Sequence, residues 1–262
     1  MEIKAKKKTF EGVEKEVKVQ TPSIDRIINA VKQRGLFHEF TRYRYGLNDI
    51  EGQLKLVEAI GKARNPGFVI DDDNRFTYEN FIKWCWGDET FKCIRPDTKQ
   101  IVPGNLRKGI YIAGNTGSGK SWCLEIMQAY SLGMNFGISF DDDVKPRPLY
   151  WYNHRADEIC DSYVKDGSFI GCKEMPMLGI QDLGQEPAEC LFMGNRLDVI
   201  RNLIEYRGDR SDQITFITSN MSMNGNNLIN RYGDRVASRL MQMCNYFEIK
   251  GKDRRDEWNH GQ

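Results

Sequence analysis

The sequence has few of the features that mark secreted, metal-binding or membrane proteins. Its seven cysteines are an odd number and form no Cys-x-x-Cys pair, which argues against a disulfide framework and against a zinc site. No apolar run approaches the roughly 20 residues of a membrane-spanning helix, and the N-terminal stretch lacks the apolar centre of a secretory signal. These absences predict a soluble, cytoplasmic protein with reduced thiols.

The chain also lacks an excess of charge of either sign. Its 262 residues carry a formal net charge of +1, so binding to nucleic acid would depend on local basic patches rather than on a global field. Apolar residues make up 40% of the chain, which suffices for a large hydrophobic core. The length predicts one large domain, alone or with a smaller region attached.

The first part of the chain reads as a charged arm followed by helices. Residues 1 to about 20 are charged and irregular, which predicts a flexible arm. An apolar stripe then predicts an amphipathic helix, with Ile24, Ile27, Ile28 and Val31 on one face. A second helix is predicted up to an Asn-Pro-Gly turn. We place a domain boundary after that turn, which gives an N-terminal region of residues 1–67 and a domain of residues 68–262.

From about residue 108, short apolar runs alternate with helical patterns. The runs are GIYIAG, PLYWY, MLGIQ, ITFITSN and NYFEIK, and helices are predicted over 121–131, 155–165, 195–206 and 234–243. Continuous apolar strands that alternate with helices predict an α/β fold with a parallel sheet covered on both faces. The acidic run at 71–74 has no glycine where a calcium loop needs one, and it is predicted to be a solvated turn.

One octapeptide carries a specific chemical signal. GNTGSGKS fits the pattern G-x-x-x-x-G-K-[ST] and lies between a predicted strand and a predicted helix, the setting that this motif requires. Its glycines let backbone N–H groups curl around phosphate oxygens at the positive end of the helix. Lys120 would reach the β- and γ-phosphates, and the Ser121 hydroxyl would ligate Mg²⁺. We therefore predict a nucleotide phosphate site formed by Gly114, Asn115, Thr116, Gly117, Ser118, Gly119, Lys120 and Ser121.

Four further residues are candidates to complete this site. Asp182 ends a predicted strand, where an acid can hold the metal, and helix capping is its alternative role. Asn220 ends a later strand and could hold the attacking water or form a turn. Arg235 and Arg239 lie one helical turn apart, where they could offer a finger to a neighbouring subunit's nucleotide or form a solvated face.

Five segments together resemble a known family in their order and spacing. They are GNTGSGKS, GIQDLGQEP, ITFITSN, RYGDRVASRL and CNYFEIKGKDRR, which span roughly residues 75–256. The family is the AAA+ ATPases of the bacterial replicative helicase loader type (DnaC/DnaI), to which the transposition ATPase IstB is similar. The resemblance implies a P-loop AAA+ fold with a parallel five-stranded sheet of order 5-1-4-3-2, helices on both faces, and a small helical N-terminal region.

The resemblance also implies cofactors, partners and residue roles. The cofactors are ATP and Mg²⁺, Asn220 matches sensor 1, Arg239 the arginine finger, and Arg255 the sensor 2 arginine. The partners are a replicative DNA helicase, docked by the N-terminal helices, and single-stranded DNA, with head-to-tail homo-oligomers that form rings or spirals. Arginines and tyrosines alternate over residues 41–46 and could bind such a strand, or could serve the fold instead. An IstB-like regulator that binds duplex DNA and recruits a transposase remains the alternative.

The chain departs from the family at one acidic position. Family members usually read D-D-L-G or D-E-x-G, whereas this chain reads Gln181-Asp182-Leu183-Gly184. Either Gln181 replaces the metal-positioning aspartate and Asp182 is the catalytic base, or Asp182 serves the metal and the base is missing or supplied from elsewhere, with Glu186 a distant candidate. A glutamine can orient a metal-bound water but brings no negative charge. The sequence thus predicts an ATPase but does not determine whether it hydrolyses ATP efficiently. A hydrolysis-deficient, nucleotide-gated scaffold is a further alternative.

Overall fold

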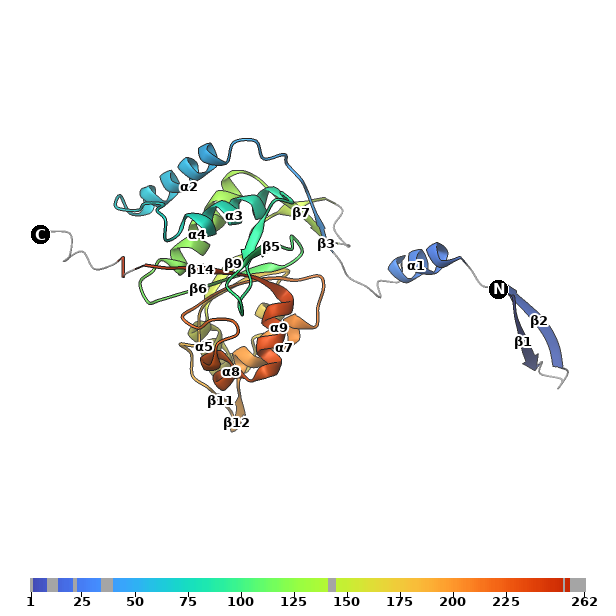
Figure 1. Cartoon of the computed structure of the whole chain (residues 1–262). Coiled ribbons are helices and arrows are strands. Elements are labelled where there is room, and N and C mark those ends of the chain that lie inside the picture. Colours follow the sequence, from blue (N-terminus) through green and yellow to red (C-terminus); the bar gives the residue numbers. More distant parts are fainter. Residues whose placement is uncertain are drawn as a thin grey trace, which may run out of the picture. The chain divides into compact units, whose positions relative to one another are not determined.

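The computed structural model describes residues 2–8, 14–20, 23–33, 40–140, 145–251 and 253–254. The chain divides into two compact units, Met1–His38 and Glu39–Gln262. In the first unit, β1 (Glu2–Lys8) and β2 (Glu14–Gln20) pair antiparallel and α1 (Ile24–Gln33) follows (Figure 1). The prediction of an irregular arm was wrong, because apolar and charged residues alternate along the second strand with the period of two that suits a strand.

A seven-stranded sheet of order β5-β4-β14-β6-β13-β10-β9 organises the second unit. Five of these strands pair in parallel, and their order across the sheet, counted along the chain, is 5-1-4-3-2. Two antiparallel strands extend one edge, so the sheet has seven strands where five were predicted. The bounds are β4 (Lys92–Ile94), β5 (Ile101–Pro103), β6 (Gly109–Gly114), β9 (Tyr152–Arg155), β10 (Met177–Leu183), β13 (Ile214–Ser219) and β14 (Cys244–Ile249).

Helices cover both faces of this sheet, as an α/β fold requires (Figure 1). One layer consists of α2 (Ile50–Arg64), α3 (Arg75–Trp86) and α4 (Lys120–Gly133). The other layer consists of α5 (Ala156–Asp166), α6 (Ile170–Glu174), α7 (Val199–Gly208), α8 (Asn226–Tyr232) and α9 (Asp234–Met243). The central strands β14, β6, β13 and β10 contribute side chains to two hydrophobic cores, one on each face.

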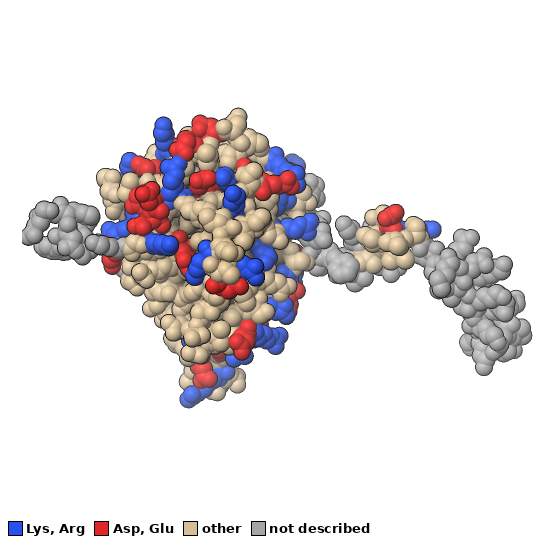
Figure 2. All heavy atoms as spheres, viewed as in Figure 1, with Lys and Arg blue, Asp and Glu red and all other residues tan. Residues whose placement is uncertain are grey.

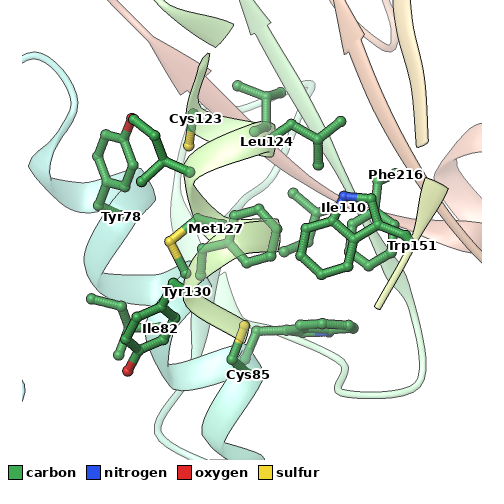
Figure 3. Close-up of a cluster of buried hydrophobic side chains, with 14 of the residues drawn as sticks. Tyr78, Ile82, Cys85, Ile110, Cys123, Leu124, Met127, Tyr130, Trp151 and Phe216 are labelled. Carbon is green, nitrogen blue, oxygen red and sulfur yellow. The ribbon is translucent and has the colours of Figure 1, made fainter. Parts of the chain in front are cut away.

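Stacked aromatic rings form the centre of the first core. The ring centroids of Trp151 and Phe216 lie 4.1 Å apart, and Phe81 from α3 stacks on Trp151 at 5.7 Å. Figure 3 shows Trp151 and Phe216 side by side, with side chains of α3 and α4 gathered next to them. Because large aromatic side chains contribute much of the free energy of burial, this stack anchors α3 and α4 to the sheet.

The second unit begins upstream of the domain boundary predicted after residue 67. It includes α2, which packs on α3 and α4 and buries Leu54 and Val57. A Cβ atom on Gly61 would lie 2.1 Å from the Phe68 ring, so only glycine lets that ring reach the helix. The reason for the difference is that the apolar face of α2 is covered by the second unit itself.

Several smaller elements differ from the sequence predictions. The helix predicted over 195–206 begins at Val199, because β11 (Cys190–Phe192) and β12 (Asn195–Leu197) form a hairpin before it. The strand predicted in PLYWY lies further along the chain, as β9. A small sheet of β3 (Phe40–Arg42), β7 (Gly137–Phe140) and β8 (Arg147–Pro148) was not predicted.

Across the described part of the chain, no helix has both the length and the apolar composition that a membrane crossing requires.

Candidate nucleotide site

The phosphate loop lies between β6 and α4, at the carboxyl edge of the parallel sheet. Gly117 and Gly119 have φ angles of +76° and +94°, a region that favours glycine. A Cβ atom on Gly114 would lie 2.3 Å from the carbonyl oxygen of Ile249, so the loop leaves the sheet in close contact with β14. These glycines allow the tight curl that turns backbone N–H groups toward an anion at the start of α4.

Lys120 and Asn220 meet at this loop, although they are 100 residues apart in the sequence. The Lys120 ammonium group donates to the Asn220 Oδ1 atom at 2.7 Å and to the Asn115 carbonyl oxygen at 2.8 Å. The Asn220 amide nitrogen donates to the Thr116 hydroxyl at 3.3 Å. Asn220 follows the end of β13, next to β6, so the order of the strands places its amide beside the loop.

Ser121 and Asp182 form the second pair of the site. The Ser121 hydroxyl donates to the Asp182 Oδ1 atom at 3.3 Å. A bulge interrupts the pairing of β10 with β13 between Ile180 and Leu183, and Asp182 adopts a φ of +57°, which is rare for a residue with a side chain. The Asp182 N–H donates to Thr218 at 3.0 Å, which holds this backbone in place. A hydroxyl and a carboxylate at this separation offer the oxygen ligands that Mg²⁺ prefers.

Gln181 points away from Asp182 and toward α4. Its side-chain amide donates to the Glu125 Oε1 atom at 3.0 Å, and the residue is buried. Glu125 in turn pairs with Arg64 of α2. The acid that lies beside the Ser121 hydroxyl is therefore Asp182, whereas Gln181 contacts α4.

Glu186 has a structural environment that does not suit a catalytic base. Its carboxylate accepts hydrogen bonds from Arg231 at 2.8 Å, from the Tyr232 hydroxyl and from the Gly184 N–H at 2.8 Å. Its side chain is fully buried, and burial together with this carboxylate raises the pKa of Tyr232. Since its lone pairs are occupied by these donors, Glu186 stabilises the turn after β10.

Arg155 is a neighbour of the site that the sequence analysis missed. It ends β9 beside Gln181, and its guanidinium lies 3.4 Å from the Asp182 carboxylate. A stronger pairing with Asp157 at 3.1 Å, together with Asp182, raises the pKa of Arg155. Its position at the start of a predicted helix that follows a predicted strand was the available signal, because such residues gather at the carboxyl edge of a parallel sheet.

Of the two arginines that the family resemblance assigns to the nucleotide, the structure describes Arg239 but not Arg255. Arg239 lies on α9, where it pairs with Asp209 and donates to Gln242 at 3.0 Å. Its stem packs on Gly208, and its guanidinium has no contact with the phosphate loop among the interactions of the described residues. Arg255 lies outside the described residues, but the preceding Arg254 donates its backbone N–H to the Gly117 carbonyl oxygen at 2.9 Å.

Three of the four arginines and tyrosines in residues 41–46 make contacts within the fold, and Arg44 pairs with Glu89 at the surface. Arg42 donates to the Trp84 carbonyl oxygen and stacks over the Trp84 ring at 4.1 Å. Tyr43 bonds Ser139 at 2.7 Å, and the Tyr45 hydroxyl accepts from the Gly137 N–H at 2.6 Å. Figure 2 shows acidic and basic atoms interspersed on the face in view. The interpretation of this segment as a stacking platform for DNA bases is therefore not supported by its contacts.

Comparisons with known proteins give structural neighbours only. No family model and no curated protein matches the chain. A protein from Streptococcus pyogenes serotype M3 described as a candidate primosome component matches with a TM-score of 0.48 and 19% identity, over 71% of this chain and 85% of its own. The DnaC helicase loader matches with a TM-score of 0.47 and 16% identity, over 71% and 95%. The replication initiator DnaA bound to AMPPCP and single-stranded DNA gives 0.44 and 15%, over 71% and 49%.

At these TM-scores the similarity itself carries no conclusion about chemistry, which depends on the residues of the site. Those residues fit a nucleotide with Mg²⁺. The curled loop supplies backbone donors, Lys120 supplies a cation, and Ser121 and Asp182 supply oxygen ligands. Asn220 adds a neutral amide at the same edge.

Proposed function

We propose that this chain is an ATP-binding AAA+ protein that loads or remodels a replicative DNA helicase on single-stranded DNA. The observation that supports it most is the convergence at one phosphate loop of Lys120 and Ser121 from the start of α4, Asp182 from β10 and Asn220 from the end of β13. The choice of a helicase as cargo depends on the order and spacing of the five family-like segments in the sequence.

The residues of the site have separate roles in binding and sensing the nucleotide. The loop amides and Lys120 would bind the β- and γ-phosphates, and Ser121 and Asp182 would hold the metal. Mg²⁺ would offset the negative charge of the phosphates when it is bound. Asn220, already bonded to Lys120 and Thr116, would exchange these contacts for the γ-phosphate or the water beside it. The neutral Gln181 leaves Asp182 as the acid beside Ser121, which favours binding over rapid turnover.

Nucleotide affinity tests the core of this proposal. We expect the full chain to bind ATP in a Mg²⁺-dependent manner in isothermal titration calorimetry. Lys120→Ala should weaken binding roughly 10- to 100-fold, because a hydrogen bond to a charged group contributes about 1.5–3 kcal/mol. Asp182→Asn should lose most of the Mg²⁺ dependence. Lys55→Ala, at an exposed position of α2, is the matched control and should bind as wild type does.

Equal affinity of wild type, Lys120→Ala and Lys55→Ala would contradict the assignment of the loop. The partner is tested separately by sedimentation with a hexameric replicative helicase and with a transposase, each with single-stranded or duplex DNA. Binding to the helicase supports the loader, and binding to the transposase with duplex DNA supports an IstB-like regulator. ATP binding without phosphate release in any of these mixtures supports the nucleotide-gated scaffold.

A further inference from the structure

The segment after β14 crosses the phosphate loop. Its described residues are 250, 251, 253 and 254, which we call the C-terminal strap. The Arg254 N–H donates to the Gly117 carbonyl oxygen at 2.9 Å, and the Lys250 N–H donates to the Asp73 carbonyl oxygen at 3.3 Å. Gly251 has a φ of +106°, and a Cβ atom there would lie 2.6 Å from the Asp73 carboxylate. The strap is thus attached to the phosphate loop at one end and to the turn before α3 at the other.

An ion pair fixes the strap in this position. The Arg254 guanidinium donates to both carboxylate oxygens of Asp71, at 2.7 and 2.8 Å. Burial acts to raise the pKa of Asp71, but the hydrogen bond and the charge of Arg254 outweigh it and lower that pKa. A two-bond pair of this kind is geometrically specific. The acidic turn that the sequence analysis predicted to be solvated therefore holds the strap through Asp71.

The strap places a carboxylate directly on the loop. A Cβ atom on Gly117 would lie 1.8 Å from the Asp253 Oδ1 atom, so the carboxylate is in contact with the backbone of this glycine. The same loop would receive the phosphates of a nucleotide, which are also anions. Like charges held close together near a protein surface repel each other more strongly than they do in water. Closure of the strap and binding of a polyphosphate therefore oppose each other.

We propose that Asp71 and Asp253 set the nucleotide affinity of the phosphate loop. Asp71 holds Arg254 and with it the strap, and the Asp253 carboxylate disfavours phosphate binding until the strap moves away. This inference rests on the proposed binding of nucleotide at the loop. Because linkage is reciprocal, a bound nucleotide weakens the Asp71–Arg254 pair by the same factor by which the closed strap weakens nucleotide binding.

The test is the affinity of the full chain for ADP with Mg²⁺, measured by isothermal titration calorimetry. Asp253→Asn and Asp71→Asn should each bind ADP roughly 3- to 10-fold more tightly than wild type does. Asp72→Asn is the matched control, because Asp72 is an exposed carboxylate of the same turn, and it should change the affinity less than about twofold. The double variant should gain less than the product of the two single gains, because both act through one strap.

The controls separate failure of this inference from failure of the proposed function. If wild type and Lys120→Ala bind ADP equally or not at all, the loop does not bind nucleotide, and both proposals are overturned. If Lys120→Ala alone weakens binding while Asp71→Asn and Asp253→Asn match Asp72→Asn, the nucleotide site stands and the strap has no influence. Weaker binding by Asp253→Asn would show that this carboxylate supports the metal, which also overturns the inference.

Discussion

At the scale of single residues, a one-residue slip in β10 decides which side chain faces Ser121 at the phosphate loop. Leu178 and Ile180 face the second core, and with strict alternation Asp182 would follow them. The bulge at Asp182 puts Leu183 in that core instead and turns the carboxylate toward Ser121. Gln181 then faces α4, where its amide donates to Glu125.

This geometry predicts that Gln181→Asp does not create a better ATPase. The new carboxyl would lie buried beside Glu125, and two like charges in one site disfavour each other. We expect the variant to lose about 1–3 kcal/mol of stability at pH 7, measured by urea unfolding, with no gain in steady-state phosphate release. The deficit should shrink as the pH falls from 7 to 5, because the raised pKa of the new carboxyl lets it become neutral.

Gln181→Met is the matched control, since it removes the amide without adding a charge. Any loss of stability in this variant should stay the same between pH 7 and pH 5. A gain in phosphate release by Gln181→Asp would reverse the interpretation, because it would place this position on the metal and Asp182 in the role of base.

At the scale of elements, the sequence predicts the features that depend on residues close together in the chain. The phosphate loop follows from its glycines and its place between a strand and a helix, and the parallel strands follow from continuous apolar runs. The contacts of Arg155, Asp71 and Arg254 depend on strand order and on the course of the chain after β14. The β11–β12 hairpin has strands of three residues each, too short for a periodic signal, so its second strand was absorbed into a predicted helix.

The position of α2 gives a prediction about where the second unit begins. Leu54 and Val57 are buried, and burial of such side chains contributes about 1.5–3 kcal/mol each. A chain of residues 39–262 should therefore unfold in urea at the same midpoint as the full chain. A chain of residues 68–262 lacks α2 and should lose about 3–6 kcal/mol, since two such side chains and the helix cover α3 and α4.

Near-UV circular dichroism of the two shortened chains provides an independent measurement, because the tryptophans of α3 pack in the first core. Equal midpoints for the two shortened chains would support a boundary after residue 67 instead.

At the scale of the whole molecule, the proposed assembly depends on an arginine that is engaged within its own chain. Arg239 pairs with Asp209 across α9 and α7, and its side chain is 28% exposed. A finger must reach the nucleotide of the next subunit, so Arg239 has to leave Asp209 when subunits associate head to tail. The intrachain pair therefore competes with assembly.

This competition predicts opposite effects for the two partners of the pair. Arg239→Ala should abolish ATP-dependent association of the full chain, measured by light scattering or sedimentation velocity. Asp209→Ala breaks the same pair but leaves the arginine available, so it should associate at a lower protein concentration than wild type does. Both variants lose one partly exposed ion pair, which contributes about 0–1 kcal/mol, and their stabilities should be nearly equal.

Arg235→Ala is the control for a general loss of positive charge on α9, because Arg235 is 64% exposed and lies one helical turn away. It should associate as wild type does. If Arg239→Ala and Asp209→Ala behave alike, the pair acts only within the chain, and Arg239 is not the finger. If all three variants behave like wild type, subunit contacts do not involve this face of α9, and a ring or spiral built through it is excluded.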